Sequence, residues 1–405
     1  MKYKSFLVFS LLMLQVVNGQ DLESLIKIGV ENSPSLQKFE LKYLGMSEKK
    51  NEVNTLPNTE IGFGYFVSEP ETRTGAQRFK VSIKQMIPWF GSISSRENYS
   101  KSMAAVSFED VQIAKRKLIL SISKQYYDLY AIKAKQKVVL ENKTLLNSYE
   151  KLALKALEVA KASAVDILRL QMRQNELEQL SAVLEQNYIA QQTALNLLLN
   201  REKTWSISVP ETLELPISEA LFNSQNLDLH PELIQYDRLY SSVMESELLN
   251  QKENKPMIGF GLDYIAVSER PAMNFTDNGK DILMPMVSVS IPIFSKKYKS
   301  KTLQNELKQQ EIKTEKQERM NALMTLLETA KTNRVVARIR FETQVKNSEQ
   351  ARNAEKLLLQ NYETGTVNFT DVLEIQELQL KFQTQQIEAV KNYFVQTTII
   401  NYLSQ

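Results

Sequence analysis

The sequence predicts a mostly α-helical protein with a small β part, in which long helical hairpins pack as coiled coils. The first observation behind this prediction is the uneven placement of the strongest helix breakers. Among 405 residues there are 11 glycines and 11 prolines, and neither type occurs between Gly91 and Pro210. After Pro292 the remaining sequence contains only Gly365. Two spans of more than a hundred residues are therefore free to be helical, and both are rich in Leu, Ala, Glu, Gln and Lys.

The second observation is a seven-residue spacing of apolar side chains within these spans, which is typical of coiled-coil seams. It predicts a long helix at about 92–158 and a returning helix at about 166–199, followed by a second hairpin of the same kind near the C-terminus. The seams comprise Val106, Ile113, Leu120 and Tyr127, then Leu170, Leu177 and Leu184, then Leu323, Ala330 and Ala337, and finally Leu373, Leu380, Ile387 and Phe394.

The chain is also an internal duplication. Four short segments recur in the same order about 200 residues apart, and chance similarity would not preserve that order. The pairs are 32–37 with 229–235, 61–64 with 258–261, 85–90 with 289–294, and 164–168 with 369–373. This pattern predicts a first repeat at 20–200, a linker at 201–229 that carries Pro210 and Pro216, and a second repeat at 230–405. Each repeat is expected to run helix, two strands, long helix, turn, helix.

Four segments alternate apolar and polar residues, as half-buried strands do. They are expected at about 61–67, 79–87, 258–264 and 287–293, and their length of roughly 9–11 residues would suit tilted transmembrane strands. Ordinary hairpins in a soluble α+β domain are the alternative. Four strands cannot close a barrel, and open edges in hydrocarbon are costly, so copies of the chain would have to complete it. This reasoning leaves 8, 12 and 16 strands open.

Aromatic residues stand where the strands give way to helices. Trp89, Phe90 and Phe294 occupy these junctions. Aromatic side chains gather at membrane–water interfaces, so we expect an interfacial girdle here, in contact with lipid.

The first nineteen residues are typical of a cleaved signal peptide. Lys2 and Lys4 precede an apolar run from Phe6 to Val17, and Val17 and Gly19 would occupy positions −3 and −1 of a cut before Gln20. An uncleaved anchor helix is the alternative. No later stretch approaches 18 consecutive apolar residues, so any membrane passage of the mature chain would have to be made by strands.

Composition excludes several functions. There is no cysteine and only one histidine, which argues against disulfides, lipoprotein acylation, thiolate metal sites and histidine catalysis. The 50 basic and 47 acidic residues are nearly balanced and give no support for nucleic-acid binding. We find no phosphate-binding loop, nucleophile elbow or metalloprotease motif. The sequence therefore predicts neither an enzyme nor a cofactor or metal site.

Each helical hairpin turns at a related motif. Asp166 and Asp371 are expected to be the N-caps of the returning helices, with Glu374 completing a capping box around Asp371. Gly365 is expected to end the preceding helix with a positive φ.

The run Tyr362-Glu363-Thr364-Gly365-Thr366-Val367-Asn368-Phe369-Thr370-Asp371-Val372-Leu373 resembles the periplasmic tip motif of the TolC-type outer membrane efflux protein family. The helix starts at Pro34 and Pro231 and the two Gly-Phe-Gly strands are similar as well, so the resemblance covers the whole mature chain. It implies a homotrimer with a 12-stranded β-barrel in the outer membrane and a tunnel of 12 helical columns across the periplasm. It further implies docking to a periplasmic adaptor protein, which couples the channel to an inner-membrane pump.

The resemblance also assigns residues. Asp371 and Glu374 would form a carboxylate ring at the periplasmic constriction, and Tyr362 would take part in contacts that keep the tip shut. The adaptor would touch Ala162, Ser163, Val367 and Asn368. Many family members carry a basic residue at the position of Val367, so here packing would replace a polar latch.

One further segment of the sequence bears on the exported substrate. The segment from Glu71 to Gly91 is similar to the heavy-metal branch of the family, which serves pumps of the resistance–nodulation–division (RND) type. Small solutes, heavy-metal cations or drugs among them, are thus the expected cargo. The alternative is a periplasmic or surface coiled-coil scaffold without transport activity, which would leave the four alternating strands unexplained.

Overall fold

The computed structural model describes residues 21–159, 163–218, 224–271 and 273–404. It is 71% helical with a small antiparallel sheet, which confirms the predicted fold class. The helices are α1 (Leu22–Asn32), α2 (Pro34–Val53), α3 (Ser92–Glu158), α4 (Ala164–Leu198), the 3-10 helix η1 (Ser224–Leu229), α5 (Pro231–Glu253), α6 (Lys296–Thr364) and α7 (Phe369–Ser404). The strands are β1 (Glu60–Tyr65), β2 (Glu71–Thr72), β3 (Gly75–Ile87), β4 (Met257–Ser268) and β5 (Ile282–Ser290). The predicted signal peptide lies outside the described residues.

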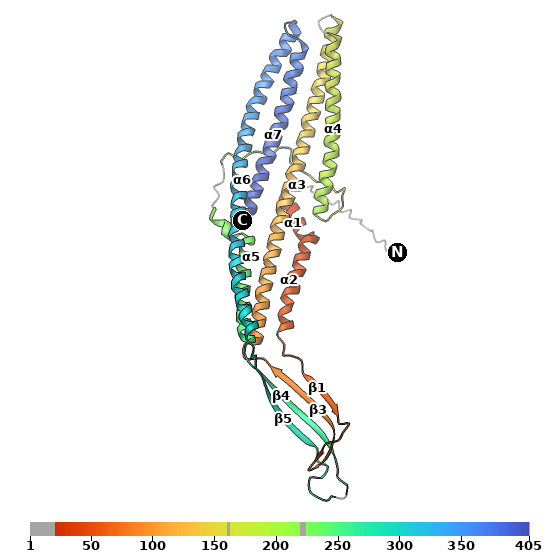
Figure 1. Ribbon diagram of the computed structural model, residues 1–405. Helices are drawn as coiled ribbons and strands as arrows, with labels where there is room; N and C mark the ends of the chain where they lie inside the picture. The colour runs from red at the N-terminus through yellow and green to blue at the C-terminus, as the bar shows by residue number, and fades with distance from the viewer. Residues whose placement is uncertain (1–20, 160–162, 219–223, 272, 405) are drawn as a thin grey trace, which may run out of the picture. The chain divides into compact units, whose positions relative to one another are not determined.

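The two halves of the chain contain their main elements in the same order (Figure 1). The first half runs α2, β1, β3, α3 and α4, and the second runs α5, β4, β5, α6 and α7. The sequence did not predict α1, β2 or η1, which are short. The exact repeat boundaries stay a prediction.

The residues group into two compact units, and each half contributes to both. Among the described residues, unit 1 comprises those of 21–34, 115–218 and 326–404, and unit 2 comprises those of 35–114 and 224–325. Unit 2 contains the whole sheet, whose strand order is β1-β3-β4-β5, with β2 paired to β3. The central β3–β4 pair joins the two halves of the sequence, with Ile83 opposite Leu262. Within this sheet, β1 and β5 are the edge strands.

The sheet has one apolar and one polar face, because successive side chains of a strand point to opposite sides. The apolar face is solvent-exposed: the exposed fraction is 74% for Ile61 and 71% for Val287. It comprises Ile61, Phe63, Tyr65, Val81, Ile83, Phe260, Leu262, Tyr264, Leu283, Val287 and Val289. The opposite face is more polar: it carries glycines, serines and an ion pair between Lys80 and the fully buried Asp263, beside the apolar side chains of Met86, Ile265, Met284 and Met286. The fourth strand ends at Ser290 rather than at Ile293, since Pro292 cannot donate to a strand ladder.

In unit 1 the hairpins α3–α4 and α6–α7 share an apolar core of the predicted seam residues, among them Leu170, Leu177 and Leu380. A polar cluster interrupts this core. The carboxylate of Glu355 accepts hydrogen bonds from the Tyr149 hydroxyl and, at 2.8 Å, from the Gln379 amide. Burial and the bond to Glu355 raise the pKa of Tyr149. Buried polar pairs inside coiled coils favour one register over others, so this cluster aligns the two hairpins.

Candidate functional site

The turn between α6 and α7 is built around a glycine in the left-handed conformation. Gly365 has φ +80°, its N–H donates to the Tyr362 carbonyl at 3.0 Å, and the Thr366 N–H donates to the Asn361 carbonyl at 2.9 Å. These two bonds form a Schellman motif, which satisfies carbonyls at the end of α6. The predicted role of Gly365 in ending this helix is confirmed.

Replacing Gly365 with alanine should destabilise this turn. A Cβ at this position would meet no atom within 4 Å, so the cost comes only from the backbone conformation. We expect a loss of about 1 kcal/mol, visible as faster amide hydrogen exchange at the end of α6. Glu363→Ala in the preceding turn is the matched control and should leave exchange nearly unchanged. Equally fast amide exchange in the Gly365→Ala and Glu363→Ala variants would contradict the role of Gly365 in ending α6.

The helices that follow the turns begin earlier than the sequence predicted. α4 begins at Ala164, and its N-cap is Ser163, whose Oγ accepts from the Val165 N–H at 3.1 Å. Asp166 completes the capping box by accepting from the Ser163 N–H at 3.1 Å. The prediction that Asp166 is the N-cap was therefore wrong, because Ser163, directly before α4, accepts from a free amide of its first turn while Asp166 closes the capping box.

Asp371 is not an N-cap either. α7 begins at Phe369, so Asp371 lies in its first turn, where its N–H donates to the Asn368 carbonyl at 3.1 Å. The capping box with Glu374 is consequently absent from the described residues. Both carboxylates are exposed and, three residues apart, lie on the same side of α7. A carboxylate in the first turn still gains from the positive end of the helix dipole.

Tyr362 belongs to the apolar core beside the turn. Its ring lies 5.0 Å from that of Phe369, and half-buried Val367 packs against the same cluster. The Tyr362 hydroxyl is buried without a hydrogen-bond partner among the described residues. Burial, and next the negative charge of Asp166, raise the pKa of Tyr362. Packing of Val367 and Tyr362 therefore adds to the two backbone hydrogen bonds of the turn.

One polar contact between the hairpins was not predicted. The Arg169 guanidinium of α4 donates to the Thr370 hydroxyl of α7. No sequence pattern indicates this contact, because the two residues are 201 positions apart. Of the residues expected to touch an adaptor, Ser163 and Asn368 are exposed, Val367 is half-buried, and Ala162 lies outside the described residues.

The junction aromatics lie in unit 2, between the strands and the helices that follow them. The exposed fraction is 38% for Trp89, 82% for Phe90 and 88% for Phe294. The rings of Trp89 and Phe90 meet edge to face with centroids 6.1 Å apart. Large, exposed aromatic surfaces next to the apolar sheet face are what an interfacial role requires.

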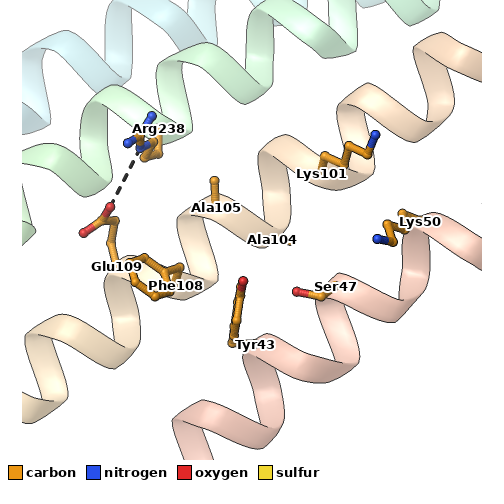
Figure 2. A pocket seen from close by; sticks show the side chains of 9 residues that line it. All are labelled: Tyr43, Ser47, Lys50, Lys101, Ala104, Ala105, Phe108, Glu109 and Arg238. Carbon is orange, nitrogen blue, oxygen red and sulfur yellow. Dashed lines mark ion pairs between the residues drawn. The ribbon is translucent and has the colours of Figure 1, made fainter.

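A groove of about 550 Å³ lies between α2, α3 and α5 of unit 2. Figure 2 shows Tyr43, Ser47 and Lys50 of α2 facing Ala104 and Phe108 of α3. At its other side Arg238 reaches Glu109, with a nitrogen–oxygen distance of 3.8 Å. Burial raises the pKa of Glu109 although Arg238 acts in the opposite direction.

Glu109→Gln should stabilise the protein at neutral pH. The folded-state pKa of Glu109 lies above its ordinary value of 4.5, so the native state binds the proton more tightly than the unfolded state. The free energy of unfolding therefore falls as the pH rises through the folded-state pKa of Glu109, and this loss persists at pH 7. Thermal unfolding between pH 4 and 8 should show a gain for Glu109→Gln that disappears below pH 4.5. The exposed control Glu306→Gln should show no such gain; a gain of equal size there would contradict the assignment.

Within the described part of the chain, no group of three or more histidine, aspartate or glutamate side chains is placed to hold a metal ion. Across the same residues, no helix is both long and apolar enough to cross a membrane.

Solved structures with the same architecture include outer membrane proteins. The outer membrane protein VceC from Vibrio cholerae superposes with a TM-score of 0.74 at 15% identity, covering 95% of this chain and 96% of its own. For CusC, described for its transmembrane channel formation, the TM-score is 0.79 at 13% identity, with coverages of 96% and 92%. For the open MtrE outer membrane channel of Neisseria gonorrhoeae it is 0.73 at 16% identity, with coverages of 94% and 88%.

No protein-family model matches the sequence, and no curated protein matches it either. The likeness in fold is nevertheless nearly complete over both chains in each superposition. The chain has the fold of the TolC-type outer membrane channels.

Proposed function

We propose that the chain is the outer-membrane channel subunit of a tripartite efflux system, exporting small solutes from the periplasm. The observation that carries this proposal is the sheet of unit 2, whose apolar face is exposed while its other face is polar. An exposed apolar face of this size is unfavourable in water and favourable in lipid. The fold of the solved outer membrane channels supports the same function.

The channel is a homotrimer in this proposal. The edges β1 and β5 would leave backbone groups unpaired in hydrocarbon, at several kcal/mol for each group, unless other copies pair with them. Three copies of the four long strands give twelve. The helices also expose apolar side chains at helical spacing, such as Leu168 and Met172 on α4 and Val335 and Ile339 on α6. Neighbouring copies would cover these stripes in a closed tunnel.

The tip of the α6–α7 hairpin forms the periplasmic constriction in this account. With three copies, Asp371 and Glu374 supply six carboxylates around a narrow pore, which favours cations. A periplasmic adaptor would dock on the tip, with Ser163 and Asn368 as exposed contacts, and would link the channel to an RND-type pump. Heavy-metal cations and drugs are the cargo classes that the sequence resemblance favours.

Membrane extraction tests this proposal against the coiled-coil scaffold. A protein with lipid-embedded strands should remain in the outer-membrane fraction after washing with alkaline carbonate or urea. A peripheral scaffold should be released by either treatment. Release of the full chain would overturn the proposed function.

A further inference from the structure

A second cavity, in unit 1, is separate from the tip turn. It has a volume of about 520 Å³ and lies between α1, α3 and α7. Its apolar wall includes Leu22 and Ile26 of α1 together with Leu120 and Tyr127 of α3. Cavities of roughly 300–1,000 Å³ with an apolar wall and a few convergent polar groups are typical small-molecule sites.

The polar side chains that line this cavity are Glu23 of α1, Arg116 and Ser123 of α3, and Thr397, Thr398 and Asn401 of α7. Arg116 and Asn401 are the nitrogen donors among them. Arg116 is half-buried, and one nitrogen of its guanidinium donates to the Tyr402 carbonyl at 3.3 Å. Of the carboxylates that the structure describes, none lies within ion-pair distance of it, and the Asn401 amide has no hydrogen bond to any other described residue. Burial lowers the pKa of Arg116, but a guanidinium remains charged at neutral pH.

The contact with Tyr402 alone has a simple structural explanation. A cation at the end of α7 satisfies a terminal carbonyl and complements the helix dipole. That role uses only one of the five N–H donors of a guanidinium. Capping the end of α7 does not explain why an apolar cavity lies beside the other N–H donors of Arg116. A guanidinium presents its free N–H groups as a planar fork that matches a carboxylate in two-point geometry.

We propose that this cavity binds an organic carboxylate with a compact apolar body. The carboxylate lies against the Arg116 fork, with the Asn401 amide as a second donor, and the apolar body packs on Leu22, Ile26 and Leu120. Tyr127 adds a ring face on which an aromatic ligand can pack. The proposal does not depend on the channel function, because the cavity lies within one chain.

Binding of 2-naphthoate to the full chain in lipid nanodiscs, measured by calorimetry against empty nanodiscs, tests the proposal. We expect one saturable site per chain. Arg116→Gln should weaken naphthoate binding at least tenfold, because the charged fork is lost. The neutral analogue 2-naphthalenemethanol should bind weakly and equally to the wild type and to Arg116→Gln. The exposed α6 substitution Arg340→Gln is the matched control and should bind naphthoate as the wild type does.

Because Arg116→Gln also removes a contact at the end of α7, a second variant separates binding from folding. Ile26→Trp fills the cavity from α1 and leaves Arg116 and Tyr402 in place, so it should abolish binding of both compounds. Absence of saturable naphthoate binding to the wild type would overturn the proposal. Undiminished binding to Arg116→Gln, or to an Ile26→Trp variant that melts like the wild type, would overturn it equally.

Discussion

Val287→Arg should strongly reduce insertion of the chain into the outer membrane. Val287 is 71% exposed and lies on the apolar face of β5, opposite Phe260 of β4. An arginine on the lipid face of a transmembrane barrel costs about 2–4 kcal/mol near the bilayer midplane. Each copy in an assembled channel would carry the charge, so this free-energy cost would arise once for every copy. The measurement is the fraction of the protein that resists carbonate extraction from outer membranes.

Ser290→Arg provides the control for this prediction. Ser290 is exposed on the same strand but on the opposite, polar face, where a charge would meet water in the channel. We expect normal insertion of this variant. If both variants inserted normally, or if both failed alike, the proposed orientation of the two faces would be contradicted.

Asp371→Asn combined with Glu374→Gln should lower the cation preference of the channel several-fold. The two side chains are exposed on one side of the first turns of α7, and three copies would place six negative charges in the constriction. Amides keep the size and polarity of the carboxylates but remove the charge. The reversal potential under a salt gradient, recorded in planar bilayers, measures the change.

Glu349→Gln is the matched control for the tip, since this exposed glutamate of α6 lies away from the turn. It should leave the reversal potential unchanged. A double variant at Asp371 and Glu374 with wild-type selectivity and conductance would contradict the carboxylate ring while leaving the channel itself intact.

The sequence predicted the long elements well, because a strong periodic pattern fixes them. Both bounds predicted for α3, 92 and 158, agree with the structure, since Gly91 and the turn after Glu158 interrupt an otherwise unbroken helical pattern. The strands were predicted from alternation, and Pro292 explains why β5 ends early. The pairing of β3 with β4 could not be read from the sequence, because strand order depends on contacts between residues almost 200 positions apart.

At the tip, the sequence identified the correct residues but not all of their roles. Gly365 was predicted correctly because the chain has few glycines and a positive φ strongly favours one. The N-cap of α4 was misplaced because Ser163 and Asp166 both fit the capping pattern. Ser163 accepts from the Val165 N–H as the N-cap, and Asp166 accepts from the Ser163 N–H as the other half of the capping box. The Arg169–Thr370 bond and the Tyr149–Glu355 cluster depend on how the hairpins pack, for which a single sequence carries no signal.

Single-channel recording from the detergent-extracted protein in planar bilayers, with the oligomer mass determined on the same sample, tests the channel assignment most directly. We predict a trimer that gives small, cation-selective conductance steps, as expected for a channel nearly closed at an acidic tip. A soluble monomer, or a sample that gives no conductance, would contradict the assignment and favour the coiled-coil scaffold.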